Sequence, residues 1–328
     1  MLSGVRTKDI AEVAGSMVEP ITKLIECING ALGKTFEPRQ IKKKTEAEAE
    51  RITILSEKLR ENCDIPIVIK NDEISLSTPD YDEFLKRTQN RMAYQELKKQ
   101  QNIETVANKA AAVLADEEAV TSEPVDQDWL LRFFNTVEDV GNEEMQEIWA
   151  RLLAGEVKKP GTFSLRTLET LRNMTHAEAV MFEKMCSHCI ITAGSRAILR
   201  DEEYLTEIEI PFGMILKLSE CGLINSSSFL GVDIKLNSEK PLVTRTDDYI
   251  AIATTNEIKK VNINIYPLTN SGIELSQIAG CHMALDEFKT VTKKIEEMTK
   301  VSPFPIYRIQ EIQGERINYY ETEDSLDE

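Results

Sequence analysis

The feature that most constrains the fold is a close succession of amphipathic segments between residues 126 and 185. Apolar residues recur there at intervals of three and four, which places them on one face of a helix. The clearest set is Met145, Ile148, Trp149, Leu152 and Leu153. Residues that favour helix starts precede the segments, namely Asp126 or Asp128, Asn142, Ser164 and Thr175. The pattern predicts four tightly packed helices within a helical core domain over residues 128–204.

The N-terminal part, residues 1–62, predicts amphipathic and charged helices. In residues 1–35 the apolar residues have helical spacing, but basic and aromatic residues are few. We therefore favour a helix packed on its own domain or in an oligomer over one lying on a membrane. Residues 37–61 predict an exposed, charged helix. Its basic cluster is a candidate contact for phosphate or an anionic surface, although such runs are commonly just solvated: Arg39, Lys42, Lys43 and Lys44.

Three further stretches complete the predicted organisation. Residues 63–115 predict a short strand or loop followed by a helix from Tyr81 to about Leu114, and residues 116–127 an acidic linker. Residues 205–300 predict a helix, strand-like runs and a final helix, the layout of a winged helix. Residues 301–320 predict a strand-like extension and residues 321–328 an acidic tail. The expected fold is mainly α with a smaller α+β part: long N-terminal helices, a central helical bundle and a C-terminal winged-helix-like domain.

Charge limits the partners of this chain. It has 39 basic and 56 acidic residues, a formal charge of −17, which repels bulk nucleic acid. The candidate recognition helix has only Lys217, and the wing offers Lys259 and Lys260 beside acidic residues. We therefore interpret the winged helix first as a protein-interaction domain, with DNA binding as the alternative. Long apolar runs and a signal peptide are not evident, so we expect a cytoplasmic protein, with a peripheral inner-membrane location as the alternative.

The sequence offers few groups for catalysis or metal binding. It has no glycine-rich phosphate loop, no nucleophile elbow and only three histidines. The Cys-x-x-Cys pair lies in an apolar stretch and lacks a second pair, so zinc is a weak hypothesis and buried thiols are favoured. The weak ligand candidates are Cys186, Cys189, Cys221 and Cys281. We expect no cofactor and no enzymatic activity.

The segment from Asp128 to Phe182 resembles a bacterial family of uncharacterised proteins related to the abortive-infection alpha group of phage-defence proteins. Upstream stretches, 37–50 and 91–110, share the resemblance, which covers most of residues 20–280 and is most distinctive over Glu144–Thr167. It implies a helical bacterial protein that acts in defence against phage, and it carries over no catalytic residue. The polar positions that it marks as interaction candidates are Arg151, Glu156, Ser164 and Arg166.

Together these observations favour a non-enzymatic interaction protein, a defence component of abortive-infection type. It would act as a homo-oligomer or through a protein partner, a phage component included. One alternative is a winged-helix DNA-binding transcription regulator. The other is a peripheral membrane effector that uses the N-terminal amphipathic segment.

Overall fold

The computed structural model describes residues 19–32, 67–70, 73–76, 81–115, 117, 120–227, 231–314 and 316–321. The chain divides into two compact units. The N-terminal unit comprises residues 1–161 and the C-terminal unit residues 162–328. This boundary falls inside the range 128–204 that we expected to form one helical core.

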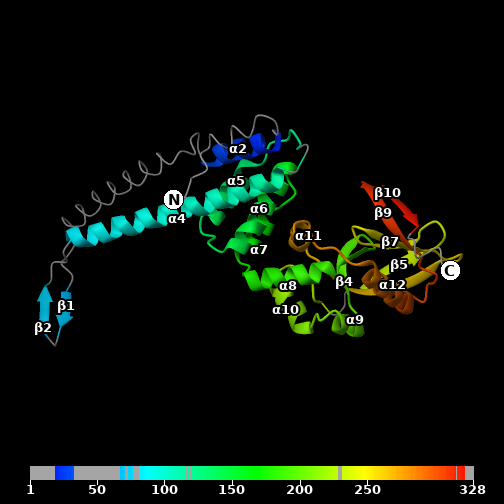
Figure 1. The fold of residues 1–328 in the computed structure, drawn as a ribbon. Helices are drawn as coiled ribbons and strands as arrows, with labels where there is room; N and C mark the ends of the chain where they lie inside the picture. The colour runs from blue at the N-terminus through cyan, green and yellow to red at the C-terminus, as the bar shows by residue number, and fades with distance from the viewer. Residues whose placement is uncertain are drawn as a thin grey trace. The chain divides into compact units, whose positions relative to one another are not determined.

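Where the structure describes the N-terminal unit, its regular elements are helices and one small hairpin (Figure 1). Its strands are β1 (Ile67–Lys70) and β2 (Glu73–Leu76), which pair antiparallel. Its helices are α2 (Glu19–Leu32), α4 (Tyr81–Leu114), α5 (Gln127–Val137) and α6 (Glu143–Lys158). The predicted helix from Tyr81 to about Leu114 is confirmed, and so are the first two helices expected after residue 126.

Aromatic residues form the centre of the N-terminal core. The Trp129 and Phe133 rings are stacked with centroids 5.2 Å apart, and Phe133 meets Trp149 edge to face at 5.5 Å. The two helices that carry them start at side-chain caps, because Asp126 accepts from the Trp129 N–H and Asn142 from the Met145 N–H. The caps fix where each helix begins, and so which residues face the core.

The C-terminal unit is built on an eight-stranded antiparallel sheet in the order β10-β9-β7-β6-β3-β4-β8-β5. Its helices are α7 (Leu165–Arg172), α8 (His176–Ser187), α9 (Glu202–Glu207), α10 (Phe212–Glu220), α11 (Asn270–Ser276) and α12 (Leu285–Thr299). Its strands are β3 (Ile190–Thr192), β4 (Ser195–Leu199), β5 (Gly231–Leu236), β6 (Leu242–Arg245), β7 (Tyr249–Ala253), β8 (Lys259–Pro267), β9 (Ile306–Gln313) and β10 (Arg316–Glu321). Buried residues of α12, Phe288 and Val291 among them, pack against β7 and β8.

The expected fold class is wrong. The chain is a mixed α/β protein, and its C-terminal unit is a large sheet with helices rather than a winged-helix-like domain. The strand-like runs near residues 231–236, 249–253 and 259–267 do form strands. They are parts of one continuous sheet, however, because β8 pairs with β4 as well as with β5, and β7 pairs with β9.

The centre of the sheet is a hairpin that periodicity did not predict. β3 and β4 pair with Thr192 opposite Ser195, which leaves a two-residue turn at Ala193 and Gly194. Both turn residues have positive φ, 48° and 78°. Two left-handed residues match the right-handed twist of the adjoining strands, so they favour a tight hairpin. β3 has only three residues, too few for a period to be read from it.

Helix α8 starts at a complete capping box. The Glu178 carboxylate accepts hydrogen bonds from the Thr175 N–H at 2.8 Å and the Thr175 hydroxyl at 2.9 Å. These two bonds, and then the ion pair with Lys217 at 3.1 Å, lower the pKa of Glu178 from 4.5 to about 2. A carboxyl group whose pKa is lowered by folding stabilises the fold most when it is ionised.

We therefore expect Glu178→Ala to lower the free energy of unfolding of the C-terminal unit by about 1 kcal/mol near neutral pH. The difference from the wild type is fully present above the ordinary pKa of 4.5 and shrinks as the pH falls toward about 2. Calorimetric unfolding across this pH range measures it. Glu183→Ala, on an exposed position of the same helix, is the control. A pH-independent loss of stability in Glu178→Ala would contradict this role.

The N-terminal helix α2 is packed inside its own unit. Leu24, Cys27 and Ile28 are buried, and α2 contacts α4, α5 and α6. These buried residues of α2 belong to the core of the N-terminal unit. No helix in the described part of the chain is both long and apolar enough to cross a membrane. The predicted acidic tail and the basic cluster at residues 39–44 lie outside the described residues.

Candidate functional site

Helix α4 presents a long exposed face. The helix has 34 residues, a length of about 51 Å. From Arg87 to Gln100 no side chain is buried, whereas buried positions recur from Asn102 onward. Exposed residues at spacings of three and four form one face, which we call the α4 face: Arg87, Arg91, Tyr94, Leu97, Lys98 and Gln101.

The α4 face combines positive charge with apolar surface in an acidic chain. Its charged members are all basic, and Tyr94 and Leu97 are 66% and 61% exposed. Arg and Tyr are enriched where proteins bind each other, because each offers a large contact area with a polar end. The α4 face can therefore bind an acidic surface that has some apolar character.

The same unit has an acidic surface at the start of α6. Asp139, Glu143 and Glu144 are exposed there, and we call them the α6 acidic patch. Two carboxylates beside it are already paired, Glu138 with Lys99 at 2.5 Å and Glu147 with Lys109 at 3.1 Å. The N-terminal unit therefore carries both a basic and an acidic contact surface.

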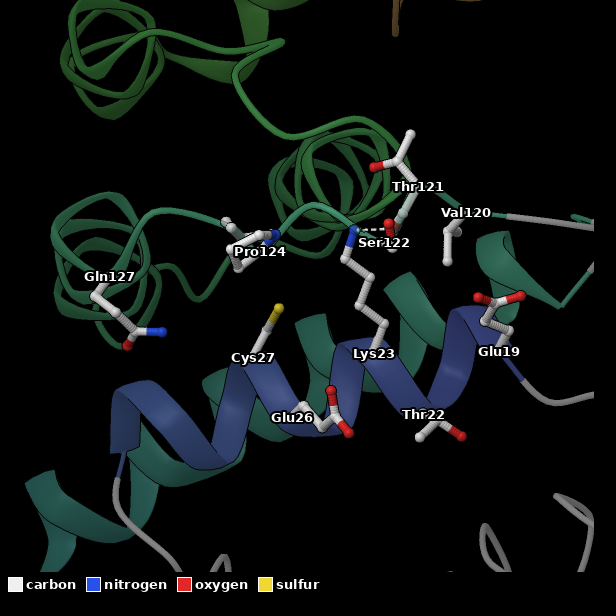
Figure 2. A pocket seen from close by; sticks show the side chains of 11 residues that line it. Glu19, Thr22, Lys23, Glu26, Cys27, Val120, Thr121, Ser122, Pro124 and Gln127 are labelled. Carbon is white, nitrogen blue, oxygen red and sulfur yellow. Dashed lines mark hydrogen bonds between the residues drawn. The ribbon is translucent and has the colours of Figure 1, made fainter.

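A groove in the N-terminal unit separates α2 from the segment before α5 (Figure 2). Its volume of about 660 Å³ lies within the range of about 300–1,000 Å³ found for ligand pockets. Lys23 and Cys27 point from α2 toward this segment, and Lys23 Nζ donates to the Thr121 carbonyl at 2.7 Å. Pro124 and Gln127 line the groove further along.

The groove offers no activated nucleophile among its described residues. Burial raises the pKa of the Cys27 thiol from 9.0 to about 11, although the Lys23 charge opposes the shift. Cys27 is thus a neutral thiol at pH 7, and a thiol reacts only through its thiolate.

Two of the four polar positions that the resemblance marked make hydrogen bonds that hold the local structure. Glu156 is buried, and its carboxylate accepts from the Gly161 N–H at 2.6 Å. Ser164 caps α7, and its own N–H donates to Glu274 at 2.6 Å. Arg151 is half-buried on α6, and Arg166 is exposed on α7.

The structure brings three of the four candidate cysteines to one place. Cys186, Cys189 and Cys281 line a small cavity at the end of α8, whereas Cys221 lies beside Glu178 and Lys217. Within the described residues no three His, Cys, Asp or Glu side chains are arranged to hold a metal ion. All three cysteines are free thiols in the structure. The sequence analysis grouped these three with Cys221 as weak ligand candidates, and the structure separates Cys221 from them.

The basic residues of the expected wing and recognition helix are also engaged. Lys259 Nζ donates to the Lys300 carbonyl, and Lys260 on β8 is opposite Lys235 on β5. Lys217 pairs with Glu178 and lies 3.8 Å from Glu220. Lys259 and Lys260 lie on β8, between β4 and β5 of the large sheet, so the winged-helix layout expected around these residues is wrong.

The α4 face was missed in the sequence, although a signal existed. Arg87, Arg91, Tyr94 and Lys98 recur at spacings of three and four, so a helical projection would have grouped them. Such a projection identifies a free face only when the side of α4 that packs against its own unit is known. The packed side was not predictable because the apolar residues between Arg87 and Gln101 do not form a helical stripe: Met92, Ala93 and Tyr94 are consecutive, and Leu97 follows.

These features define a mixed α/β protein with a helical N-terminal unit and a C-terminal antiparallel sheet. A family model described as a protein of unknown function, DUF2806, matches residues 86–291, which is more than half of the chain. The chain belongs to this family. No match was found among curated proteins or among solved structures.

Proposed function

We propose that the chain is a non-enzymatic interaction protein that self-associates through the α4 face. The observation that carries the proposal is the basic and apolar face on α4, in a chain of net charge −17. Such a face favours an acidic partner over a basic one. Residues 128–182 resemble an uncharacterised bacterial family related to the abortive-infection alpha group, and this resemblance supports a role for the assembly in phage defence.

A second copy of the chain suits this face because the same unit carries the complementary surface. In a two-fold dimer, the α4 face of each copy can lie on the α6 acidic patch of the other. Such a dimer forms two equivalent contacts, in which Arg87 and Arg91 approach Glu143 and Glu144. A nucleic acid is less suitable, because the net charge of the chain repels its phosphates.

The double variant Arg91→Glu and Leu97→Glu tests the proposal. Wild-type chain is expected to sediment above the monomer mass at about 0.05 M salt and to approach it at about 0.5 M, since ions screen exposed charges. The double variant is expected to weaken self-association by at least about tenfold, or about 1.4 kcal/mol. Sedimentation velocity over a concentration series measures both effects.

A matched variant separates the α4 face from a general change of charge and hydrophobicity. Lys240→Glu with Ile258→Glu makes the same kinds of substitution at exposed positions of the C-terminal unit. It should associate like the wild type. Wild-type chain that stays monomeric at low salt and high concentration would refute the proposal, as would equal association of both variants.

A phage-challenge plating assay extends the test to defence. Bacteria that express the wild-type chain in its native gene neighbourhood should form fewer plaques than a deletion strain. The Arg91→Glu, Leu97→Glu variant should lose this protection and the control variant should keep it. Protection that survives loss of self-association would separate the two parts of the proposal.

A further inference from the structure

The cysteine cluster at the end of α8 joins two parts of the chain that are far apart in sequence. Cys186 lies in the last turn of α8, Cys189 just before β3, and Cys281 in the segment between α11 and α12. Together they line a cavity of about 10 Å³, and none of them is in a disulfide. A cavity of this size holds about one water molecule, so the thiols face each other with little solvent between them.

The three thiols differ in accessibility. Cys186 and Cys189 are 3% and 5% exposed, whereas Cys281 is half-buried. Hydrogen bonds of the Cys186 thiol to the Cys189 and Cys281 sulfurs, and then burial, hold its proton and raise the pKa of Cys186 well above its ordinary value. Cys186 is thus a neutral, shielded thiol that contacts both of its neighbours. A dissolved oxidant reaches Cys281 first.

We propose that Cys281 and Cys186 form a reversible modification site for hydroperoxides. In the first step the Cys281 sulfur attacks the peroxide O–O bond, which gives Cys281 sulfenic acid and releases the alcohol, or water from hydrogen peroxide. In the second step the Cys186 sulfur attacks the sulfenic sulfur, which forms the Cys186–Cys281 disulfide and releases water. The two thiols lose two electrons in total, and the peroxide gains them.

Because the Cys186 and Cys281 sulfurs are in contact, the second step needs no movement of the chain to bring them together. The two side chains are within hydrogen-bonding reach, so Cys186 acts at a high effective concentration even though its thiolate form is rare. The product would tie the segment before α12 to the end of α8. Cys281 already donates to the Glu183 carbonyl of α8 at 3.2 Å, so this segment is held beside α8 in the reduced protein.

To test this, full-length chain is treated with an equimolar amount of hydrogen peroxide. The remaining thiols are then alkylated, and the tryptic peptides are mapped by mass spectrometry. We expect the peptide ending at Arg196, which holds Cys186 and Cys189, to become linked to the peptide ending at Lys289, which holds Cys281. The mass of the linked species is two hydrogens below the summed masses of the two reduced peptides, and dithiothreitol reverses the link. Most of the oxidised Cys281 should be recovered in this form.

Serine variants assign the partners. Cys186→Ser should abolish the link and leave Cys281 as a sulfenic acid that dimedone captures, whereas Cys189→Ser should keep the link. Cys221→Ser is the control, because Cys221 is a half-buried thiol outside the cluster. Cys281 oxidised no faster than Cys221, a link that survives Cys186→Ser, or a disulfide between two copies of the chain would each overturn the proposal.

Discussion

Replacement of Trp149 with alanine should lower the free energy of unfolding of the N-terminal unit by about 3–5 kcal/mol. The side chain is fully buried and meets the Phe133 ring edge to face. Removing it leaves a large cavity among α4, α5 and α6, which are too closely packed to fill it. Chemical unfolding followed by fluorescence measures the change, because Trp129 remains as a reporter in the same unit.

A second substitution at Trp149 separates packing from hydrogen bonding. Among the described residues, Trp149 Nε1 is buried and donates no hydrogen bond. Trp149→Phe loses no such bond and keeps most of the aromatic surface, so it should cost clearly less than Trp149→Ala. Leu131→Ala, at an exposed position on α5, should change stability by less than about 0.5 kcal/mol. Equal effects of the three variants would contradict this view of the core.

Replacement of Gly272 with alanine should lower the free energy of unfolding of the C-terminal unit by about 3 kcal/mol. A Cβ atom at this position would lie 2.1 Å from the Leu223 carbonyl oxygen and 3.1 Å from its carbon. That carbonyl already accepts from the Thr269 N–H at 2.9 Å, so the backbone on both sides is fixed. The start of α11 must shift for the methyl group to fit.

Gly213→Ala is the matched control for this effect. Gly213 lies in helix α10 of the same unit, and nothing lies within 4 Å of a Cβ built there. Alanine favours a helix over glycine, so stability should be unchanged or slightly raised. Differential scanning calorimetry compares the two variants, and tryptophan fluorescence checks that the N-terminal unit is unaffected. If Gly272→Ala were as stable as the wild type, a side chain at position 272 would fit beside the Leu223 carbonyl, which contradicts this account.

Local structure was predicted well because its causes are local. The four helices expected after residue 126 are α5, α6, α7 and α8, and their predicted caps make the expected hydrogen bonds. A cap and an amphipathic period involve residues within a few positions of each other, so the sequence displays them directly.

The sheet could not be predicted because its pairings join distant residues. Thr192 of β3 is opposite Thr244 of β6, and Ala251 of β7 is opposite Ile306 of β9. Alternation along one strand shows which face is buried and does not identify the neighbouring strand. The winged-helix expectation relied on the order and pattern of the elements. The sequence likewise named Cys281 and Cys186 as candidates together with Cys221, but it could not show which of these thiols meet.

Charge complementation between two variants tests the central claim most directly. One variant carries Arg87→Glu and Arg91→Glu, and the other carries Glu143→Lys and Glu144→Lys, with folding of both checked by circular dichroism. In a dimer of either variant with itself, the α4 face and the α6 acidic patch that it meets would carry the same charge. Each variant alone should therefore sediment as a monomer. An equimolar mixture pairs each altered surface with its complement, so the mixture should form a dimer at low salt. A mixture that sediments as two monomers, while the wild type associates, would contradict self-association through α4.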